Sequence, residues 1–216
     1  MEDIYRQRIA QFQEAIRKEK GLTAALSWAR LASFVLMAVG LVQFIRSEWK
    51  ISWLLLAVVA MIAFVFLLVL YSKAQQKLQL FKTLLELNEK ELQLVTTWQS
   101  AFEDGNEFVD DKHDYTSDLD VFGPSSIFQH INRTGTFSGK HRLADVLRNP
   151  LQESAAILST QEALKVLTPE LEFRQQLTAN AVLAKEEESD RREIAAWLEM
   201  PFHFLQNKLI KIALWV

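Results

Sequence analysis

The chain has 216 residues, 50% of them hydrophobic, with a formal net charge of −3 and no cysteine. The lack of cysteine excludes disulfide bonds, thiolate metal sites and a cysteine nucleophile, and the near-neutral charge gives no overall electrostatic basis for nucleic-acid binding. Six glycines and four prolines are too few for a turn-rich β protein, so we expect an all-α fold.

The first segment, residues 1–21, is predicted to be an amphipathic helix. Its apolar residues recur at alternating spacings of four and three, which places them in one stripe along a helix. They are Tyr5, Ile9, Phe12 and Ile16, and Gly21 is expected to mark a bend after them. The acidic start and the late arrival of the first long apolar run exclude a cleaved signal peptide.

Residues 22–72 are predicted to form a transmembrane hairpin. The run from Ile51 to Tyr71 contains no charge, proline or glycine and would extend about 30 Å as a helix, the thickness of a bilayer's hydrocarbon core. The preceding run, 31–45, reaches only about 22 Å, so we expect the two spans to cover about 22–45 and 51–71. Arg30 then falls inside the first span, where it either snorkels to the near surface, which we favour, or acts as a buried functional charge.

Basic residues set the expected orientation of this hairpin. The N-terminal flank carries Arg6, Arg8, Arg17, Lys18 and Lys20. The flank after the second span carries Lys73, Lys77 and Lys82, whereas the link between the spans carries only Arg46 and Lys50. Because positive charge stays on the cytoplasmic side, both flanks of the hairpin are predicted to be cytoplasmic and the link to lie outside.

Residues 73–102 are predicted to continue the second span as a stalk helix with a heptad pattern. Its a and d positions are Leu78, Phe81, Leu85, Asn88, Leu92, Val95, Gln99 and Phe102. Asn88 is a polar d position that is expected to fix the register. The favoured partner is the N-terminal stripe of the same chain, because a tight hairpin holds the two helices adjacent. The alternative partner is a second copy of the chain in a homodimeric coiled coil.

Three further segments complete the chain. Residues 103–117 are predicted to be a solvated acidic linker, because they are acidic, interrupted by Gly and Asn, and weakly patterned. The acidic residues lack the mid-loop glycine and the closing glutamate of a calcium-binding EF-hand. Residues 118–207 have the pattern of short helices, one of them capped by Ser138. Residues 208–216 are basic and then apolar, like the start of a further transmembrane segment. Because the chain stops inside this run, we expect it to be the N-terminal piece of a longer protein.

No catalytic, cofactor-binding or metal site is predicted. The run from Gly135 to His141 lacks the spacing of a phosphate-binding P-loop, and the four histidines show no pairing at i, i+4. Basic residues of one region are candidate contacts for phosphate or DNA, with a solvated helix face as the alternative. These candidates are Arg133, Lys140, Arg142 and Arg148.

The stretch from Ser117 to Leu151 carries a family resemblance. In order it contains Leu119, Ser126-Ile127-Phe128, Ile131-Asn132-Arg133-Thr134, Thr136, Gly139, Arg142-Leu143, Leu147 and Pro150-Leu151. This order resembles the opening of the helical core, or lever, domain of the MutS family of DNA mismatch-repair ATPases. In that family the ATPase domain with its P-loop lies C-terminal to the core domain and is not contained in these 216 residues.

The resemblance implies that residues 118–207 are a partial α-helical MutS-like core domain. It also implies that the full-length protein is an ATPase, with ATP and Mg bound by a downstream domain, and that it processes DNA in a repair-like way at the bacterial cytoplasmic membrane. The present part is expected neither to bind nor to hydrolyse ATP; its partners would be the membrane and, through the full-length protein, DNA. The alternative is a structural or scaffolding membrane protein with a helical protein-interaction domain and no nucleic-acid role.

Overall fold

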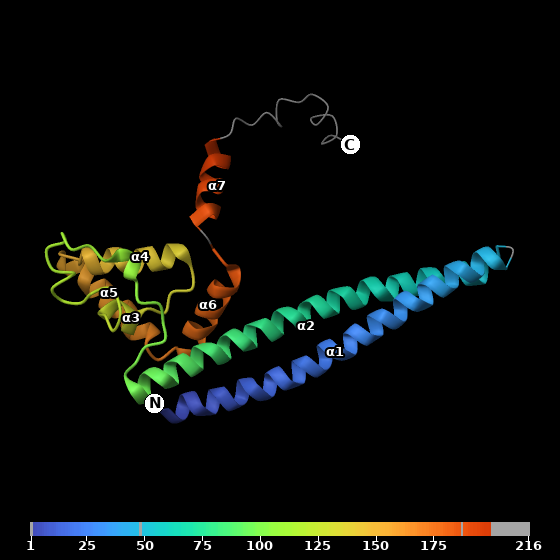
Figure 1. Ribbon diagram of the computed structural model, residues 1–216, viewed down its shortest axis with the longest axis horizontal. Coiled ribbons are helices and arrows are strands. Elements are labelled where there is room, and N and C mark those ends of the chain that lie inside the picture. Colours follow the sequence, from blue (N-terminus) through green and yellow to red (C-terminus); the bar gives the residue numbers. More distant parts are fainter. Residues whose placement is uncertain (1, 48, 187, 200–216) are drawn as a thin grey trace.

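The computed structural model describes residues 2–47, 49–186 and 188–199 (Figure 1). This part of the chain is all-helical, with one short 3-10 turn (η1, Asn106–Phe108) and no strand among the described residues. Two of the helices, α1 and α2, are long and apolar enough to cross a membrane by length and composition. The helices are α1 (Glu2–Arg46), α2 (Ile51–Thr97), α3 (Ile127–Ile131), α4 (Phe137–Arg148), α5 (Ser154–Leu167), α6 (Leu171–Ala184) and α7 (Glu188–Glu199).

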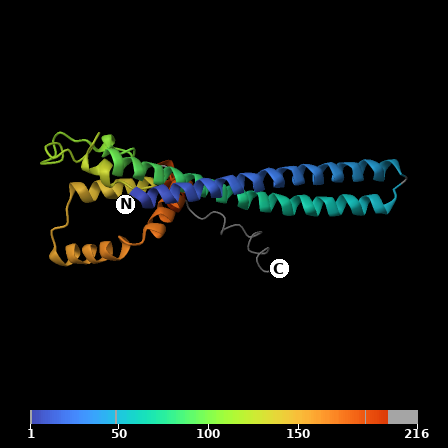
Figure 2. The same ribbon diagram turned by 90° about the horizontal axis from the view of Figure 1, so that it is seen from below.

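Helices α1 and α2 lie antiparallel and form a rod with the shorter helices gathered near one end (Figures 1 and 2). Two pairs of aromatic rings show which residues of α1 and α2 lie opposite each other. The ring centroids of Phe12 and Phe81 lie 6.1 Å apart, and so do those of Phe34 and Phe64. Helix α1 passes through Gly21 without a break. A single glycine costs a helix only about 1 kcal/mol, and buried residues on both sides of Gly21 hold α1 in place.

The size of the buried side chains differs between the two halves of the α1–α2 pair. In the half nearer the link, small residues are buried and large apolar side chains point outward; Phe66, for example, is 63% exposed. The buried residues there are Ser33, Gly40, Ala57 and Ala60. In the other half, large residues are buried, namely Phe12, Ile16, Leu78 and Leu84. The first arrangement is typical of helices surrounded by lipid and the second of helices surrounded by water.

Helix α2 ends at Thr97, before the predicted end of the stalk at residue 102. Trp98 takes a left-handed conformation with φ 61° and closes the helix through a backbone hydrogen bond to the Leu94 carbonyl oxygen, 2.9 Å long. Phe102 therefore lies beyond the heptad helix, and its ring packs under the Arg133 guanidinium at 3.9 Å.

Helix α6 covers a second face of α2 that the heptad pattern did not predict. Leu84 and Leu87 occupy neither a nor d positions, yet both are buried, in one cluster with Phe12 of α1 and Ala179 of α6. Three helices therefore meet at this level of the stalk, where the sequence pattern accounted for two.

A separate hydrophobic cluster lies in the segment that follows α2. It consists of Phe108, Val121, Phe122, Phe128 and Ala144. The prediction of a solvated linker over 103–117 therefore needs correction, because Phe108 is buried in this cluster while many of the acidic side chains around it stay exposed. Gly105 permits this packing: it adopts φ 68°, and a Cβ there would lie 2.7 Å from the Phe128 ring.

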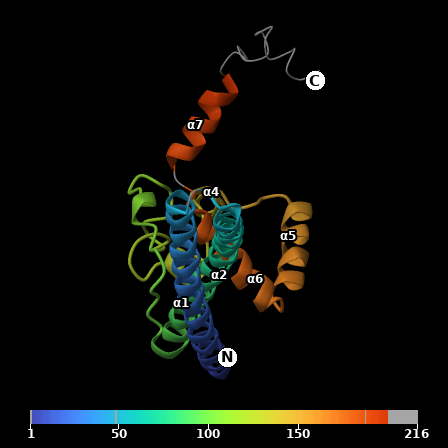
Figure 3. The same ribbon diagram turned by 90° about the vertical axis from the view of Figure 1, so that its right-hand side faces the viewer.

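Helix α5 stands apart from the α1–α2 pair (Figure 3), and none of its residues is buried. Its Leu158, Leu164 and Val166 side chains are all more than half exposed. Of the segment expected to form the core domain, residues 200–207 lie outside the described residues, and so does the expected further apolar segment 208–216.

Replacing Gly40 by leucine is expected to separate α1 from α2 near the link. A Cβ at Gly40 would already lie 3.1 Å from the Ala57 Cβ and from the Trp53 carbonyl oxygen, so a larger side chain forces the helices apart, at a cost of about 1–3 kcal/mol. We expect a lower midpoint of SDS-induced unfolding. Val39→Leu, on the outward surface next to it, is the matched control, and equal midpoints for the two variants would contradict this close approach.

Candidate functional site

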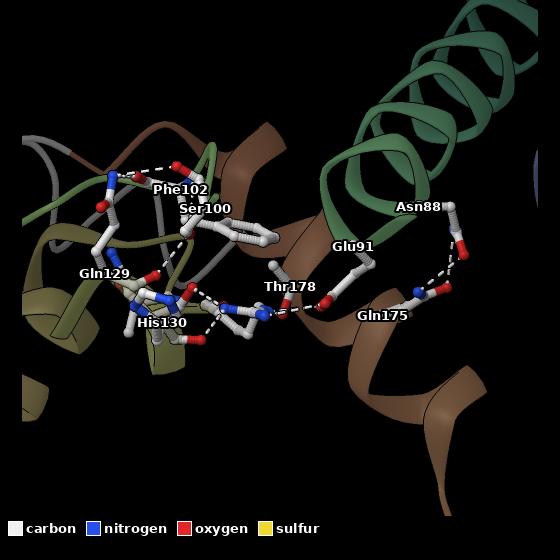
Figure 4. Close-up of polar contacts among 11 residues, drawn as sticks. Asn88, Glu91, Ser100, Phe102, Gln129, His130, Gln175 and Thr178 are labelled. Atoms are coloured by element: carbon white, nitrogen blue, oxygen red, sulfur yellow. Dashed lines mark hydrogen bonds and ion pairs between the residues drawn. The ribbon is translucent and has the colours of Figure 1, made fainter. Parts of the chain in front are cut away.

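A buried pair of amides (Figure 4) joins the stalk, which is the part of α2 after residue 72, to the helical core, which is residues 98–199. Asn88 of α2 is fully buried and Gln175 of α6 is 6% exposed. Each side chain donates a hydrogen bond to the other, and both bonds are 3.0 Å long. Asn88 also donates to the carbonyl oxygen of Leu84, one turn back, at 2.7 Å. Asn88 was predicted to fix a register within the stalk; its side-chain hydrogen bonds to Gln175 join α2 to α6.

Arg8 brings α1 into the same junction. Its Nε donates to the Gln175 Oε1 at 3.0 Å, and its guanidinium forms a 2.8 Å ion pair with Glu172 of α6. The hydrogen bond from Arg8 holds the pKa of Glu172 below its usual value. Tyr5, one turn before Arg8, is half-buried, and burial raises the pKa of its hydroxyl, with the Glu91 carboxylate adding to the effect.

A second connection joins α2 to the turn between α3 and α4. The Arg133 guanidinium lies against the Glu91 carboxylate in a two-point contact of 2.5 and 2.9 Å. It also donates to the carbonyl oxygens of His130 and Asn132, at 3.0 and 2.8 Å. All three nitrogens of this guanidinium therefore have acceptors, and the Phe102 ring lies under one of its faces. Arg133 therefore has a structural role at the position proposed for a phosphate contact.

The α3–α4 turn is built by its own polar residues. Ser126 caps α3 by accepting from the Gln129 N–H at 3.2 Å. The Asn132 side-chain oxygen accepts from the backbone N–H and the hydroxyl of Thr134, at 2.9 and 2.6 Å. Thr136 caps α4 by accepting from the Gly139 N–H at 3.0 Å. The expectation that Ser138 caps α4 is wrong by two residues, because α4 begins directly after Thr136.

Gly135 lets this turn rest directly on the backbone of α6. A Cβ at Gly135 would lie 2.8 Å from the Thr178 carbonyl oxygen and from the Val182 nitrogen. Thr178 completes the contact by donating to the Arg133 carbonyl oxygen at 3.0 Å. The turn, α2 and α6 are therefore tied to one another through buried backbone and amide groups.

Of the other three candidate phosphate contacts, two are also engaged within the chain and one is not. Lys140 lies between Glu107 and Glu103, at 2.7 and 3.0 Å; burial by itself would lower the pKa of Lys140, but the two carboxylates outweigh it and raise the pKa. Arg148 donates to the Phe108 carbonyl oxygen and stacks near two aromatic rings. Arg142 alone of the four is exposed, without a hydrogen-bond or ion-pair partner in the described part of the chain.

The cavity beside α4 has the wrong charge for phosphate. It has a volume of about 400 Å³ and is lined by the turn residues 134–136, Lys140 and the carboxylates of Glu103 and Glu186. Glu186 accepts from the Ser138 hydroxyl and, at 3.3 Å, from its backbone N–H, so a carboxylate of the chain already occupies the N-terminal end of this helix. Within the described residues no group of three histidine or carboxylate side chains is arranged to hold a metal ion.

Charge is unevenly divided between the two halves of the chain. Residues 1–97 carry twelve lysines and arginines against eight acidic residues, whereas residues 98–199 carry ten against nineteen. The helical core is therefore strongly negative and repels the phosphate backbone of nucleic acids at long range.

No protein-family model, curated protein or solved structure matches this chain.

The Asn88–Gln175 pair makes a testable contribution to the docking of α6. Replacing Asn88 by leucine leaves the buried Gln175 amide without its partner, which costs about 1–3 kcal/mol. We expect the amide hydrogens of α6 to exchange roughly 5 to 150 times faster in the full chain. The double variant Asn88→Leu/Gln175→Leu should recover part of the loss, because both buried amides are then removed and only the Arg8 Nε, whose guanidinium keeps its ion pair with Glu172, loses an acceptor.

Asn180→Leu is the matched control for this experiment, because Asn180 is an exposed amide on the same helix. It should change exchange by less than a factor of about three. Independent, additive effects of the two junction substitutions would contradict a direct Asn88–Gln175 interaction.

Proposed function

We propose that residues 1–97 are a membrane anchor that holds a helical core at the cytoplasmic membrane face. The observation that carries this proposal is the reversal of packing along α1 and α2. Small residues line the contact in one half, where large apolar side chains face outward. No soluble rod gains from that arrangement, since it exposes the large apolar side chains to water.

Arg30 supports the depth and direction of this anchor. It projects from the first proposed span, and its guanidinium lies 4.7 Å from the centre of the Tyr71 ring at the end of the second. Side chains of a helix point toward its N-terminus, so the Arg30 side chain extends away from the link and toward the stalk. This geometry supports snorkelling of Arg30 over a buried functional charge. Together with the basic flanks, it supports the proposal that both flanks of the hairpin lie in the cytoplasm.

The core is proposed to be the start of a MutS-like lever domain. Supporting this, the residues that carry the resemblance have definite structural roles: Ser126 and Thr136 cap helices, Asn132 shapes the turn, and Gly139 supplies the capped N–H. In the full-length protein, ATP and Mg would be bound by a downstream ATPase domain. The full-length activity would then be ATP-dependent DNA processing at the bacterial cytoplasmic membrane.

The basic residues of residues 1–199 favour a role in coupling the core to the anchor over a role in contacting DNA. Arg133, Lys140 and Arg148 are all engaged inside the chain. The junction of Arg8, Asn88 and Gln175 instead ties the core to both anchor helices, so any displacement of the core would act directly on the stalk. In a lever domain this junction would transmit the nucleotide-dependent position of the core to the membrane.

A second candidate is a scaffold that binds a protein partner and no nucleic acid. The specific observation in its favour is α5, whose exposed leucines have no covering element among the described residues. The excess of acidic residues over residues 98–199 points to a basic partner surface.

Membrane insertion can be tested with single cysteines, because the chain has none of its own. Ser47→Cys lies in the link, and Ser117→Cys lies at the end of the 103–117 segment that leads into the helices of the core. In intact spheroplasts we expect a membrane-impermeant maleimide to label the first, and to label the second only after permeabilisation. The reverse pattern would invert the topology, and labelling of both without permeabilisation would rule out an anchor with a cytoplasmic core.

Ligand binding tests whether this part of the chain contacts ATP or DNA by itself. For the full chain in lipid nanodiscs at low salt, we expect no saturable binding of labelled ATP and none of labelled duplex DNA, because the basic residues are paired and the core is acidic. Salt-dependent DNA binding that Arg142→Glu abolishes, while the same change at Arg46 does not, would overturn this expectation. A Gly-x-x-x-x-Gly-Lys-Ser/Thr run in the reading frame beyond residue 216 would favour the MutS-like protein over the scaffold.

A further inference from the structure

A groove between α2 and α6 opens just beyond the end of the second proposed span. It has a volume of about 490 Å³. Its lining includes Lys73, Gln76, Lys77, Leu80, Asn180 and Leu183. One wall belongs to the anchor and the other to the core, because α6 lies along this part of α2 (Figure 1).

The depth of the groove matches the headgroup layer of a bilayer. Lys73, Gln76 and Lys77 follow Tyr71 by two, five and six residues, which places them about 3–9 Å beyond it along the helix axis. The headgroup layer on each side of the hydrocarbon core is about 5–7 Å thick. The polar mouth of the groove is therefore at the level of phospholipid phosphates, on the membrane placement proposed above, on which this inference rests.

The chemistry of the lining suits an anionic amphiphile. Lys73 is exposed and has no ion-pair or hydrogen-bond partner in the described part of the chain. Lys77 forms a 2.7 Å ion pair with Glu19, which leaves Lys73 as the lining lysine without such a partner in the described part of the chain. Gln76 and Asn180 supply amide groups, while Leu80 and Leu183 form an apolar wall. No carboxylate lines the groove itself.

We propose that this groove binds the headgroup of an anionic phospholipid of the cytoplasmic leaflet, with the phosphate on Lys73. Its acyl chains run beside the outward apolar face of the second span. Arg17, Lys20 and Lys82, which are exposed on the same flank, raise the local concentration of anionic lipid around it. A lipid in this position contacts both α2 and α6 and strengthens the attachment of the core to the anchor.

The test uses the full chain reconstituted in phosphatidylcholine vesicles, with spin-labelled phosphatidylglycerol or spin-labelled phosphatidylcholine as the probe. We expect phosphatidylglycerol to be preferred. Lys73→Gln should reduce that preference about fivefold, the effect of one lysine at a charged membrane surface. Ala184→Phe should reduce it without a change of charge, because Ala184 is an exposed lining residue whose enlargement fills the groove.

Lys82→Gln is the matched control, since it removes the same charge from the same flank outside the groove. An equal loss for Lys73→Gln and Lys82→Gln would overturn the site in favour of diffuse surface charge, and so would an unchanged preference in Ala184→Phe with normal helix content by circular dichroism. Displacement of the labelled lipid by millimolar glycerol phosphate would show a soluble anion as the ligand instead.

The two proposals fail in different ways. Loss of the chain from the vesicles under alkaline carbonate would overturn the anchor itself. Retention in the vesicles with no preference for phosphatidylglycerol would overturn the groove alone.

Discussion

The contact between α1 and α2 is the interaction on which the rest of the structure depends. On the proposed membrane placement, one pair of helices has to associate in two surroundings, and the residues change accordingly, from Gly40 against Ala57 to Phe12 against Phe81. In lipid, burial of large side chains gives little net gain, so close backbone approach stabilises the pair. In water, the same helices associate by burying large apolar side chains. The core is positioned only because α1 and α2 present a fixed surface to α6.

That surface is made specific by polar groups. The apolar cluster of Phe12, Leu84, Leu87 and Ala179 would tolerate α6 in several positions. The Asn88–Gln175 amides tolerate one, because any shift leaves two buried amides without partners. Arg8 extends the same requirement to α1. We infer that the polar junction determines where α6 docks, while the apolar cluster supplies most of the stabilisation.

Composition and the uncharged apolar runs predicted the all-helical fold and the two long apolar helices, because both are local properties of the chain. Sequence periodicity missed the second buried face of α2, since Leu84 and Leu87 are buried by α6, which is distant in sequence. It also missed Phe108, whose burial depends on an aromatic cluster assembled from three separate segments. The sequence could not predict the structural roles of Arg133 and Lys140 for the same reason. Their carboxylate partners, Glu91 and Glu107, are distant in sequence and lie beside them only in the folded chain.

The continuity of α2 has a mechanical consequence. From Ile51 to Thr97 it is one helix, about 70 Å long, so the half proposed to face lipid and the half that carries the core move as a single rigid lever. The distance from Tyr71 to Thr97 is about 39 Å along the axis. A tilt of about 20°, the average for membrane helices, would carry the far end roughly 13 Å sideways. The thickness of the surrounding bilayer would then set the height and lateral reach of the core above the membrane.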